Sequence, residues 1–465
     1  MSSTAAPVGM VETRNPATGA SLQSYAVYSN SEIDGRLATA YGAFAAWKGT
    51  SFAERSDAML RLASFLRREK SRLATLMTTE MGKPIVESEA EVEKCAWCCE
   101  YYAESAQRHL ADDVIATNAT RSYVAFRPLG VILAIMPWNF PLFQVIRFAV
   151  PAIMAGNVAV LKHAANVTGC GLELERSFAA CGIPNGVFTT LVVPGRAMDS
   201  VIRDPRVAAV TFTGSEQAGA TVASAAASAL KKTVLELGGS DAYIVLSDAD
   251  VDAAAQTAVR ARFQNTGQSC IAAKRFIVDA SVYKTFLSSF TERARTLVMG
   301  DPLDRATQIG PLAREDLRDD IERQVSATVA LGAKIALGGK RRSGPGCFYE
   351  PTIVSDVVPG MPMFDEETFG PAAAVIQAQN TEHAITLANL SMYGLGGNLW
   401  TRDIRSAESI AARLQSGAVF INGMTASDPR LPFGGVKRSG YGRELSYFGL
   451  REFTNAQTVW LGPVA

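Results

Sequence analysis

Short, wholly apolar runs recur along this chain and constrain its fold more than any other feature. Four of them have lengths suited to buried strands: 130–136 (GVILAIM), 157–162 (NVAVLK), 207–214 (VAAVTFTG) and 242–246 (AYIVL). Runs without an alternating polar face are typical of parallel strands that are covered on both sides. Helical patterns alternate with these strand patterns, so the sequence predicts an α/β fold.

A second alternating series follows the first. Helical spacing at 249–263 and 283–297 flanks an apolar strand at 275–279, and further apolar runs continue toward the C-terminus. A chain of 465 residues is too long for one ordinary core. We therefore expect two α/β domains with a boundary near residue 238, and a polar-edged hairpin at 107–127.

Two helical patterns precede the first apolar strand. Residues 54–81 have apolar side chains at helical spacing, which predicts one long helix that ends at Gly82. A second helix over 85–107 contains the cluster CAWCC. Its CxxC spacing lacks a second ligand pair, so we interpret these cysteines as core residues and expect no metal site.

Charge and hydropathy exclude several classes of partner. Lys plus Arg equals Asp plus Glu, at 45 each, so no net field attracts nucleic acid or an anionic membrane. The most apolar region, 130–162, is interrupted by proline, asparagine and arginine and falls short of the roughly 18 residues that a spanning helix needs. Seven cysteines and a start without a basic, apolar leader predict a cytoplasmic protein.

Familiar catalytic signatures are missing from the sequence. It contains three histidines and no HExxH, GxSxG, GxxxxGK[ST] or strand-linked GxGxxG motif. Cys270, which ends the stretch FQNTGQSC, has small polar neighbours of the kind that can hold a thiolate. Taken alone, however, it could be an ordinary free cysteine in a turn.

Several polar residues interrupt otherwise apolar stretches: Asn139, Lys162, Ser215, Glu236, and Glu367 with Phe369. Individually, Asn139 could cap a helix, Lys162 could end a strand in solvent, and Glu236 could pair with a cation. Together they fit one mechanism. A thiolate that attacks a carbonyl needs amide donors for the oxyanion, and the resulting thioester needs a carboxylate to activate water.

Six ordered motifs, PWNFP, FTGS, LELGG, NTGQSC, EETFGP and PFGGVKRSGYGRE, closely resemble the aldehyde dehydrogenase superfamily over nearly the whole chain. The resemblance implies that Cys270 is the nucleophile and Glu236 the base for deacylation. It also implies that the Asn139 amide and the Cys270 backbone N–H form the oxyanion hole.

The same resemblance implies a cofactor cleft. Lys162 would bind the adenosine ribose, Glu367 the nicotinamide ribose, and Gly214 with Ser215 the pyrophosphate at a helix N-terminus. Trp138 and Phe369 would line the cleft. The implied fold has a Rossmann-like cofactor domain (1–106 and 128–238), an α/β catalytic domain (239–452) and a small β oligomerisation arm (107–127 and 453–465).

Two departures from the family pattern carry expectations. Ala165 stands where NAD-specific relatives have a glutamate, and His163 replaces the usual proline. A glutamate would repel a 2′-phosphate, so its absence should allow NADP as well as NAD. Ala272 stands where some relatives have a second cysteine, so a redox disulfide with the nucleophile should be missing.

Several stretches, among them LKHAANV and GRELSYFGLREF, resemble the bacterial NAD(P)-dependent succinate-semialdehyde dehydrogenases. A substrate carboxylate would then require a cation or several donors. Arg147 matches a substrate-binding arginine of that group, and Gln264 replaces a second one. Ser427 and Arg430 could complete the pocket. Alternatively, Arg147 is a surface arginine paired with an acid.

Three functions remain open at this point: oxidation of succinate semialdehyde to succinate, the same chemistry on another aliphatic aldehyde or semialdehyde, and a non-catalytic cofactor-binding or structural protein. The Cys, Glu and Asn set argues against the third. The presence of Glu236 disfavours transfer of the acyl group to coenzyme A. We also expect a homodimer or homotetramer, with residues 122–126 and 454–462 at a subunit interface.

Overall fold

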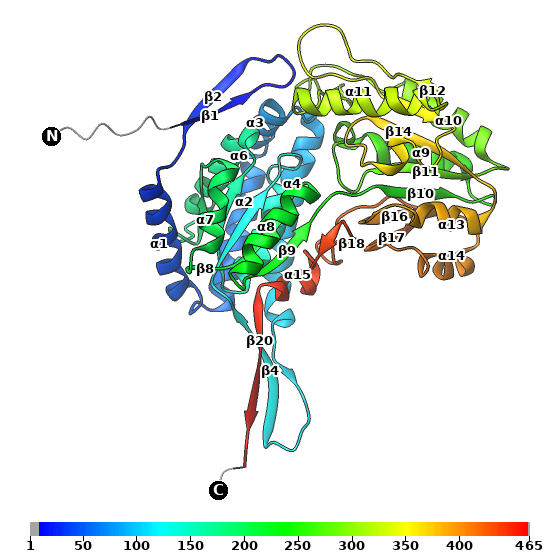
Figure 1. Ribbon diagram of the computed structural model, residues 1–465. Helices are drawn as coiled ribbons and strands as arrows, with labels where there is room; N and C mark the ends of the chain where they lie inside the picture. Colours follow the sequence, from blue (N-terminus) through cyan, green and yellow to red (C-terminus); the bar gives the residue numbers. More distant parts are fainter. Residues whose placement is uncertain (1–8, 464–465) are drawn as a thin grey trace.

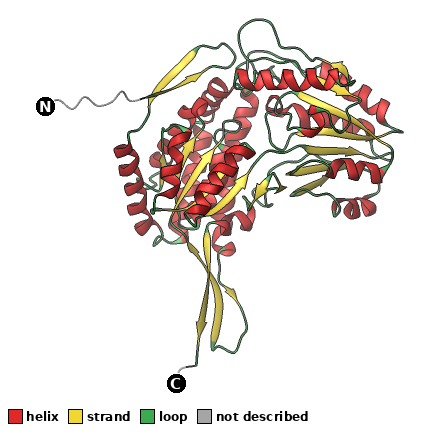
Figure 2. Ribbon diagram, in the orientation of Figure 1, coloured by secondary structure: helices red, strands yellow, loops and turns green. Residues whose placement is uncertain are grey.

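The computed structural model describes residues 9–463. Within this range two sheets, each with helices on both faces, form the body of the molecule, and a narrow β arm projects from it (Figures 1 and 2). The N-terminal hairpin of β1 (Met10–Arg14) and β2 (Ser21–Ala26) lies outside both sheets. The fold class expected from the sequence is confirmed.

Three of the four apolar runs form strands of the first sheet, β5, β6 and β8, and the fourth, 242–246, forms β10 (Asp241–Val245) of the second sheet. Its order is β19-β9-β8-β5-β6-β7, and all neighbours are parallel except β19. The strands are β5 (Val131–Met136), β6 (Val158–His163), β7 (Phe188–Thr190), β8 (Val207–Thr213), β9 (Lys232–Glu236) and β19 (Gly440–Tyr441). Because β5 is fully buried, it needs no polar face.

The order of this sheet places a ligand crevice. From β5 the chain runs outward to β6 and β7, and then returns to the other side of β5 with β8 and β9. Ligands of open α/β sheets bind beyond the carboxyl ends of the strands at such a reversal. Trp138 and Asn139 follow β5 there, and Gly214 and Ser215 follow β8.

The second sheet has the order β12-β13-β14-β11-β10-β16-β17 and is parallel except for β12. Its strands are β10 (Asp241–Val245), β11 (Ala273–Asp279), β12 (Lys334–Leu337), β13 (Thr352–Ser355), β14 (Ala372–Ala378), β16 (Gly396–Trp400) and β17 (Ala418–Ile421). A small pair, β15 (Tyr393–Gly394) with β18 (Val436–Lys437), lies beside it.

Helices α1 to α4 follow one another before the arm, and most of the later helices lie between strands in the chain. Around the first sheet they are α1 (Asn30–Trp47), α2 (Phe52–Arg68), α3 (Lys70–Met81), α4 (Ile85–His109), α5 (Phe143–Met154), α6 (Thr168–Ala180), α7 (Met198–Arg203), α8 (Glu216–Ser228) and α15 (Ser446–Glu452). Around the second they are α9 (Val251–Phe263), α10 (Tyr283–Arg295), α11 (Glu315–Ala330), α12 (Pro362–Asp365), α13 (Thr381–Asn389) and α14 (Ile404–Ala411). Short 3-10 turns are η1 (Ala165–Val167), η2 (Gly195–Ala197) and η3 (Gln264–Gly267).

The prediction of one helix over 54–81 was wrong. Glu69 has φ −92° and ψ 9°, which ends α2 and starts α3. The bend lets each helix bury its own apolar face, through Leu62 and Leu66 in α2 and through Leu73 and Met77 in α3. Helical spacing alone does not reveal such a bend because both halves keep the same period.

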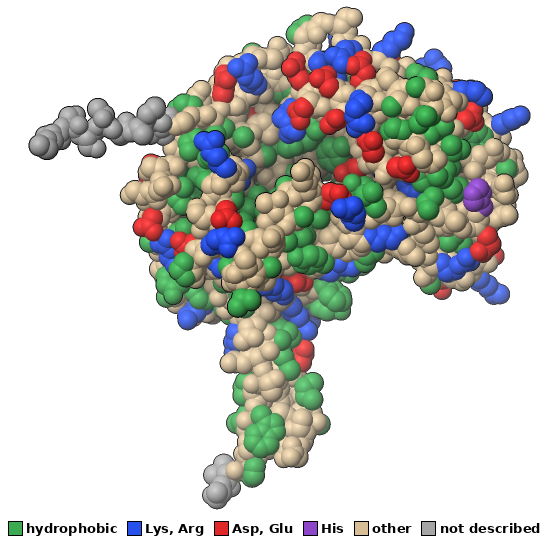
Figure 3. Space-filling view, viewed as in Figure 1, with side chains coloured by type: hydrophobic (Ala, Val, Ile, Leu, Met, Phe, Trp, Pro, Cys, Tyr) green, Lys and Arg blue, Asp and Glu red, His purple; other side chains and the backbone are tan. Residues whose placement is uncertain are grey.

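The CAWCC cluster lies inside α4, where all three cysteines are buried. Residues 9–463 contain no group of His, Cys, Asp and Glu side chains that could hold a metal ion. No helix in the same range is long and apolar enough to cross a membrane. Acidic and basic side chains alternate over the face drawn in Figure 3, in keeping with the balanced charge of the sequence.

The arm is a sheet of order β20-β4-β3, with strands β3 (Asp113–Val114), β4 (Arg121–Pro128) and β20 (Thr454–Leu461). The 107–127 segment contributes only a two-residue pairing of its own, and β4 pairs along its whole length with β20 from the chain's end (Figure 1). Hydrophobic side chains remain exposed along it, as Figure 3 shows: Val114, Ile115, Trp460 and Leu461.

Candidate active site

The segment before β11 turns sharply and presents Cys270. Asn265 and Thr266 both have φ 55°, in the left-handed region, and Gly267 follows with φ 72°. A β-branched threonine adopts this conformation only where its surroundings hold it. The buried Arg262 provides such support, because its guanidinium donates to the carbonyls of Gly267 at 2.7 Å and Ala273 at 3.0 Å. We call residues 264–270 the cysteine loop.

A cavity of about 350 Å³ opens at Cys270. Helices α4 and α5 form one wall, and the end of α9, the cysteine loop and the segment after β17 form the other. The cavity therefore lies between the two sheets. Its apolar lining includes Phe140, Phe143, Ile271, Met424 and Phe433, and its polar lining includes Glu87, Glu91, Lys94, Gln144, Arg147, Arg260, Gln264, Ser269 and Ser427.

Cys270 is half-buried, and its surroundings favour the protonated thiol over the thiolate. Burial raises the pKa of Cys270 to about 12, while the cations of Arg147 and Lys274 oppose that rise. A thiolate at neutral pH therefore requires a change in its surroundings, such as a bound ligand that brings further donors.

Asn139 lies against the cysteine loop. Its side-chain Nδ2 donates to the backbone carbonyl of Gln268 at 3.1 Å, and its backbone carbonyl accepts from Nδ2 of Asn265 at 2.8 Å. Its side chain is buried and is not among the residues that line the cavity. The two chain segments that the sequence linked to an oxyanion site are thus joined by hydrogen bonds.

Glu236 ends β9 and is fully enclosed. Within residues 9–463 neither carboxylate oxygen has a hydrogen-bond partner. Burial raises the pKa of Glu236 well above its usual range, and the nearby negative charge of Glu444 adds to that rise. A Cβ at Gly434 would lie 2.7 Å from Oε1 of Glu236, so only glycine leaves room for this carboxylate.

The cofactor residues expected from the sequence meet at the carboxyl edge of the first sheet. Ser215 begins α8 directly after β8, and Lys162 lies near the end of β6. Burial lowers the pKa of Lys162, and no charged side chain in the described residues 9–463 offsets that effect. An unpaired cation near a helix N-terminus fits the phosphates of a dinucleotide. Ala165 is exposed at the start of η1, with no acidic side chain at that position.

The residues that the sequence assigned to the nicotinamide are an aromatic pair and a carboxylate. The rings of Trp138 and Phe369 meet edge to face, with centroids 5.8 Å apart. Glu367 accepts from the backbone N–H of Gly239 at 3.0 Å and lies 3.4 Å from Nζ of Lys274. Residues from both halves of the chain thus lie together, as a cofactor between two domains requires.

The sequence matches the description "Aldehyde dehydrogenase family" over residues 3–459. The chain belongs to the aldehyde dehydrogenase family. A probable NADP(+) succinate-semialdehyde dehydrogenase from Synechocystis is 49% identical over 451 residues, which cover 97% of this chain and 99% of that protein. An NADP(+) succinate-semialdehyde dehydrogenase 1 from Mycobacterium tuberculosis is 50% identical over 454 residues, with the same coverage.

Solved structures agree with this aldehyde dehydrogenase over its whole length. A succinic semialdehyde dehydrogenase from Streptococcus pyogenes in complex with NADP+ superposes with a TM-score of 0.95 at 36% identity. The match covers 97% of this chain and all of that one. An E. coli NADP-dependent enzyme gives the same TM-score at 33% identity, over 98% of this chain and 95% of that one.

In this aldehyde dehydrogenase Arg147 is neither free nor on the surface. Its Nε forms an ion pair with Glu444, both side chains are 3% exposed, and its guanidinium lies 4.5 Å from the ring centroid of Phe433. The arginine also lines the cavity. The pairing with an acid agrees with one sequence interpretation, although the arginine is buried and not on the surface; its role as a substrate-binding residue stays a prediction. Glu444 was not singled out, although it ends the motif PFGGVKRSGYGRE.

The other predicted substrate residues differ in their placement. Gln264 and Ser427 line the cavity. Arg430 does not: its side chain is exposed, pairs with Asp428 at 2.6 Å and lies 5.5 Å from the ring centroid of Trp97. Arg430 pairs with the nearby Asp428 and so does not line the pocket, although it is close in sequence to Ser427.

Lys94 lines the cavity and was missed by sequence reasoning. Its Nζ lies 2.5 Å from Oγ of Ser427 and 4.5 Å from the ring centroid of Phe143. Burial and the cation of Arg147 lower the pKa of Lys94 to about 8. The only sequence signal was a charged residue beside the buried cysteines of α4, which is equally typical of a solvated helix face.

The acids in the cavity wall are already bonded to protein donors. Glu91 accepts from the backbone N–H groups of Leu142 and Phe143, at 2.9 Å each, and pairs with Lys83. Glu87 accepts from the backbone N–H of Asn265 at 2.6 Å, and burial raises its pKa to about 7. Neither Glu87 nor Glu91 forms an ion pair with Lys94 or Arg147, the cations that line the same cavity.

Proposed function

We propose that this protein oxidises succinate semialdehyde to succinate, with NADP or NAD as the hydride acceptor. The observation that carries the proposal is that Cys270 shares one cavity with Lys94, Arg147 and Arg260, while the acids of that cavity are bonded elsewhere. A nucleophile and cations in the same small cavity suit an aldehyde that also bears a carboxylate. The names of the relatives at 49% and 50% identity support the same substrate.

Acylation begins at Cys270. The thiolate attacks the aldehyde carbon, a C–S bond forms, and the carbonyl oxygen becomes an oxyanion in a thiohemiacetal. The backbone N–H of Cys270 and Nδ2 of Asn139 donate to that oxyanion, which requires Asn139 to release the carbonyl of Gln268 that it now holds. A nicotinamide cofactor would supply the hydride acceptor for this carbon, and loss of the hydride would leave a thioester on Cys270. The residues proposed to hold that cofactor are Lys162, Gly214, Ser215 and Glu367.

Deacylation uses water and Glu236. In its ionised form the carboxylate takes a proton from water, the hydroxide attacks the thioester, and the C–S bond breaks to return the Cys270 thiolate. Glu236 does not line the cavity in this structure, and its raised pKa favours the protonated form. The side chain must therefore turn toward Cys270 and lose its proton before this step.

The substrate carboxylate is proposed to bind the cations and the hydroxyl of the cavity. Lys94 and Ser427 already contact each other, so one carboxylate could accept from both. Arg147 contributes positive charge, although Glu444 neutralises part of it. Gln264 adds an uncharged donor. An aldehyde without a carboxylate would leave these buried donors unsatisfied.

Acceptance of NADP is proposed to rest on Lys162 and Ala165. The unpaired ammonium of Lys162 can bind a 2′-phosphate, and Ala165 places no carboxylate against it. NAD lacks that phosphate but keeps the contacts to Gly214, Ser215 and Glu367. NADP-dependent relatives are consistent with this proposal.

A substrate panel with both cofactors tests the function. Succinate semialdehyde, butanal and glutarate semialdehyde are compared by the rate of nicotinamide reduction. We expect the highest kcat/KM for succinate semialdehyde. If butanal is oxidised with equal or higher kcat/KM, the carboxylate is not recognised, and the enzyme acts on simple aliphatic aldehydes, for which the phenylalanine-rich lining is also suited.

We further propose that the arm joins subunits into a homodimer or homotetramer. Within residues 9–463, β20 has no strand on its outer edge, and Trp460 and Leu461 on it are 52% and 45% exposed. An open edge with exposed apolar side chains favours association. Separately from the assembly, we propose that the first sheet belongs to the cofactor domain and the second sheet to the catalytic domain. A stable monomer by sedimentation at micromolar concentration would contradict the assembly.

A further inference from the structure

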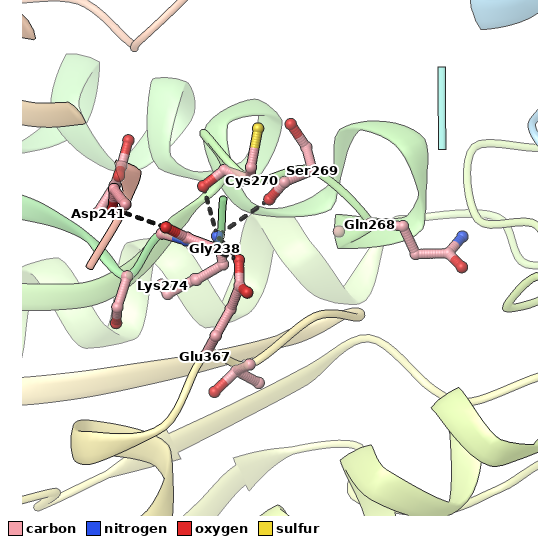
Figure 4. A network of polar contacts seen from close by, with 12 residues as sticks. Gly238, Asp241, Gln268, Ser269, Cys270, Lys274 and Glu367 are labelled. Atoms are coloured by element: carbon pink, nitrogen blue, oxygen red, sulfur yellow. Dashed lines mark hydrogen bonds and ion pairs between the residues drawn. The ribbon is translucent and has the colours of Figure 1, made fainter. Parts of the chain in front are cut away.

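Lys274 lies directly beneath the cysteine loop, at the start of β11. Its side chain is 0% exposed. Nζ donates to the carbonyl of Ser269 at 3.0 Å and to that of Cys270 at 2.7 Å, and it lies 3.4 Å from Oε1 of Glu367 (Figure 4). An ammonium has three donors and no acceptor, so these three oxygens use its whole capacity.

A buried ammonium at this position is costly. Burial lowers the pKa of Lys274, and the carboxylates of Glu367 and Asp241 oppose that change. An apolar side chain would fill the same space without loss of solvation, and a buried ion pair is often no more stable than its apolar replacement. The presence of the cation therefore calls for an explanation other than stability.

The geometry of the peptide group explains why a cation is present here. The carbonyl of Ser269 and the N–H of Cys270 belong to the same planar unit and point in opposite directions. A donor that holds the carbonyl therefore fixes the direction of the N–H. A charged donor also polarises the amide, which makes its N–H a stronger donor on the other side. Lys274 acts on this carbonyl.

We propose that Lys274 is a positioning residue that aims and polarises the Cys270 N–H toward the oxyanion of the thiohemiacetal. The inference rests on the proposed function, because it presumes attack by Cys270 on an aldehyde. Lys274 does not contact the substrate, so its effect passes through the peptide between Ser269 and Cys270.

The same lysine connects the cofactor side of the site to this peptide. Glu367, its ion-pair partner, also accepts from the N–H of Gly239. The two glycines after β9 fit tightly between these groups: a Cβ at Gly238 would lie 2.5 Å from Oε2 of Glu367, and a Cβ at Gly239 would lie 2.7 Å from the carbonyl of Cys270. A movement of Glu367 would therefore also shift Lys274, whose ammonium holds two carbonyls of the cysteine loop.

The test compares two reactions of the same thiol in Lys274→Met. Hydride transfer from succinate semialdehyde passes through an oxyanion. Alkylation by iodoacetamide forms a C–S bond and expels iodide, and no oxyanion forms in that reaction. In the variant we expect the rate of the first turnover to fall roughly 10- to 100-fold, on the scale of a lost oxyanion donor. We expect the limiting alkylation rate at high pH to stay within about threefold of wild type, because it depends on access to the thiolate.

Both reactions are followed against pH, and Cys270 labelling is read by peptide mass spectrometry. The charged groups near the thiol are Arg147, Lys274, Glu367 and Glu236, so removal of one cation should raise the pH midpoint of alkylation. Lys274→Arg should restore part of the first-turnover rate. Lys437→Met is the matched control, since Lys437 also donates to two backbone carbonyls, those of Asn389 and Ser391, in another part of the fold.

Equal slowing of both reactions would overturn the inference, because a disordered loop would then explain the result. An unchanged first turnover would overturn it as well. If Lys274→Met does not fold, Lys274→Gln, which keeps a donor without charge, allows the same comparison. Failure of the proposed function is distinguishable: wild type would then reduce no nicotinamide with succinate semialdehyde, or Cys270→Ala would retain turnover.

Discussion

Nζ of Lys94 lies 2.5 Å from Oγ of Ser427, which connects the middle of α4 to the segment after β17 across the wall of the cavity. Neither the helix nor the segment alone identifies a binding site. Their contact places a cation and a hydroxyl side by side in the wall of the cavity that Cys270 also lines.

Replacement of Lys94 by methionine keeps the packing against Phe143 and removes the charge. We expect kcat/KM for succinate semialdehyde to fall by roughly tenfold or more, the effect of losing ~1.4 kcal/mol of transition-state binding, while butanal is spared. Steady-state kinetics with both aldehydes measure this. Arg430→Ala is the control, since that exposed arginine does not line the cavity. Equal losses for both aldehydes would assign Lys94 a structural role.

The Arg147 and Glu444 pair gives a different expectation. Arg147→Met leaves Glu444 buried without its cation, so the free energy of unfolding should fall by about 3–5 kcal/mol and both aldehydes should be oxidised more slowly. The double variant Arg147→Met/Glu444→Gln should recover much of that stability. Urea denaturation of the single and double variants provides the measurement. Additive losses would show that the two side chains do not stabilise each other.

Cys270→Ala should abolish aldehyde oxidation and leave cofactor binding largely intact, because the thiol is the covalent catalyst and not a packing residue. Titration with NADP, followed by protein fluorescence, checks binding beside the activity assay. The buried Cys98 of α4 offers a matched control, since its replacement by alanine should leave the chemistry unaffected. Turnover near the wild-type rate in Cys270→Ala would remove the proposed mechanism.

Glu236→Gln should slow deacylation more than acylation, since an amide cannot take a proton from water. Rapid mixing should then show a burst of reduced cofactor followed by slow turnover. Because the pKa of Glu236 is raised and the base must be ionised, kcat of the wild type should rise with pH, and this rise should flatten in the variant. A slow first turnover without a burst would place Glu236 at an earlier step.

Ala165→Glu should shift the enzyme toward NAD. A carboxylate close to a 2′-phosphate costs roughly 1–4 kcal/mol between bulk water and a protein surface, so the NADP/NAD ratio of kcat/KM should fall about tenfold or more. Ala165→Gln is the neutral control of similar size. An unchanged ratio would mean that Lys162 or another part of the ribose pocket determines the preference between NADP and NAD.

The parts of the site that could be predicted from sequence are those fixed by the ends of strands. Asn139, Ser215 and Glu236 follow or end buried strands, and strand order brings such ends to one edge. Lys94 and Lys274 could not be predicted in the same way. Each is a common residue type whose meaning depends on what it touches, and their partners Ser427 and Glu367 are distant in sequence.

Arg147 illustrates the same limit from the opposite direction. The family resemblance singled it out and it lines the cavity, yet its ion pair with Glu444 depends on how α5 packs against the C-terminal part of the chain. The bend at Glu69 is also a matter of packing, because no glycine or proline marks it. Local pattern therefore predicts elements and their ends, whereas long-range contacts decide charge pairing.

The pairing of β20 with β4 has a consequence for the order of biosynthesis. Arg121 lies opposite Leu461, so the arm cannot form before β20 has been synthesised and has left the ribosome. Before that point β4 lacks its main partner strand, and an unpaired strand edge invites aggregation. Both sheets of the body can fold earlier from sequences already synthesised. Subunits should therefore assemble only after translation ends, and a ribosome stalled short of the last strand should carry a folded but unassembled chain.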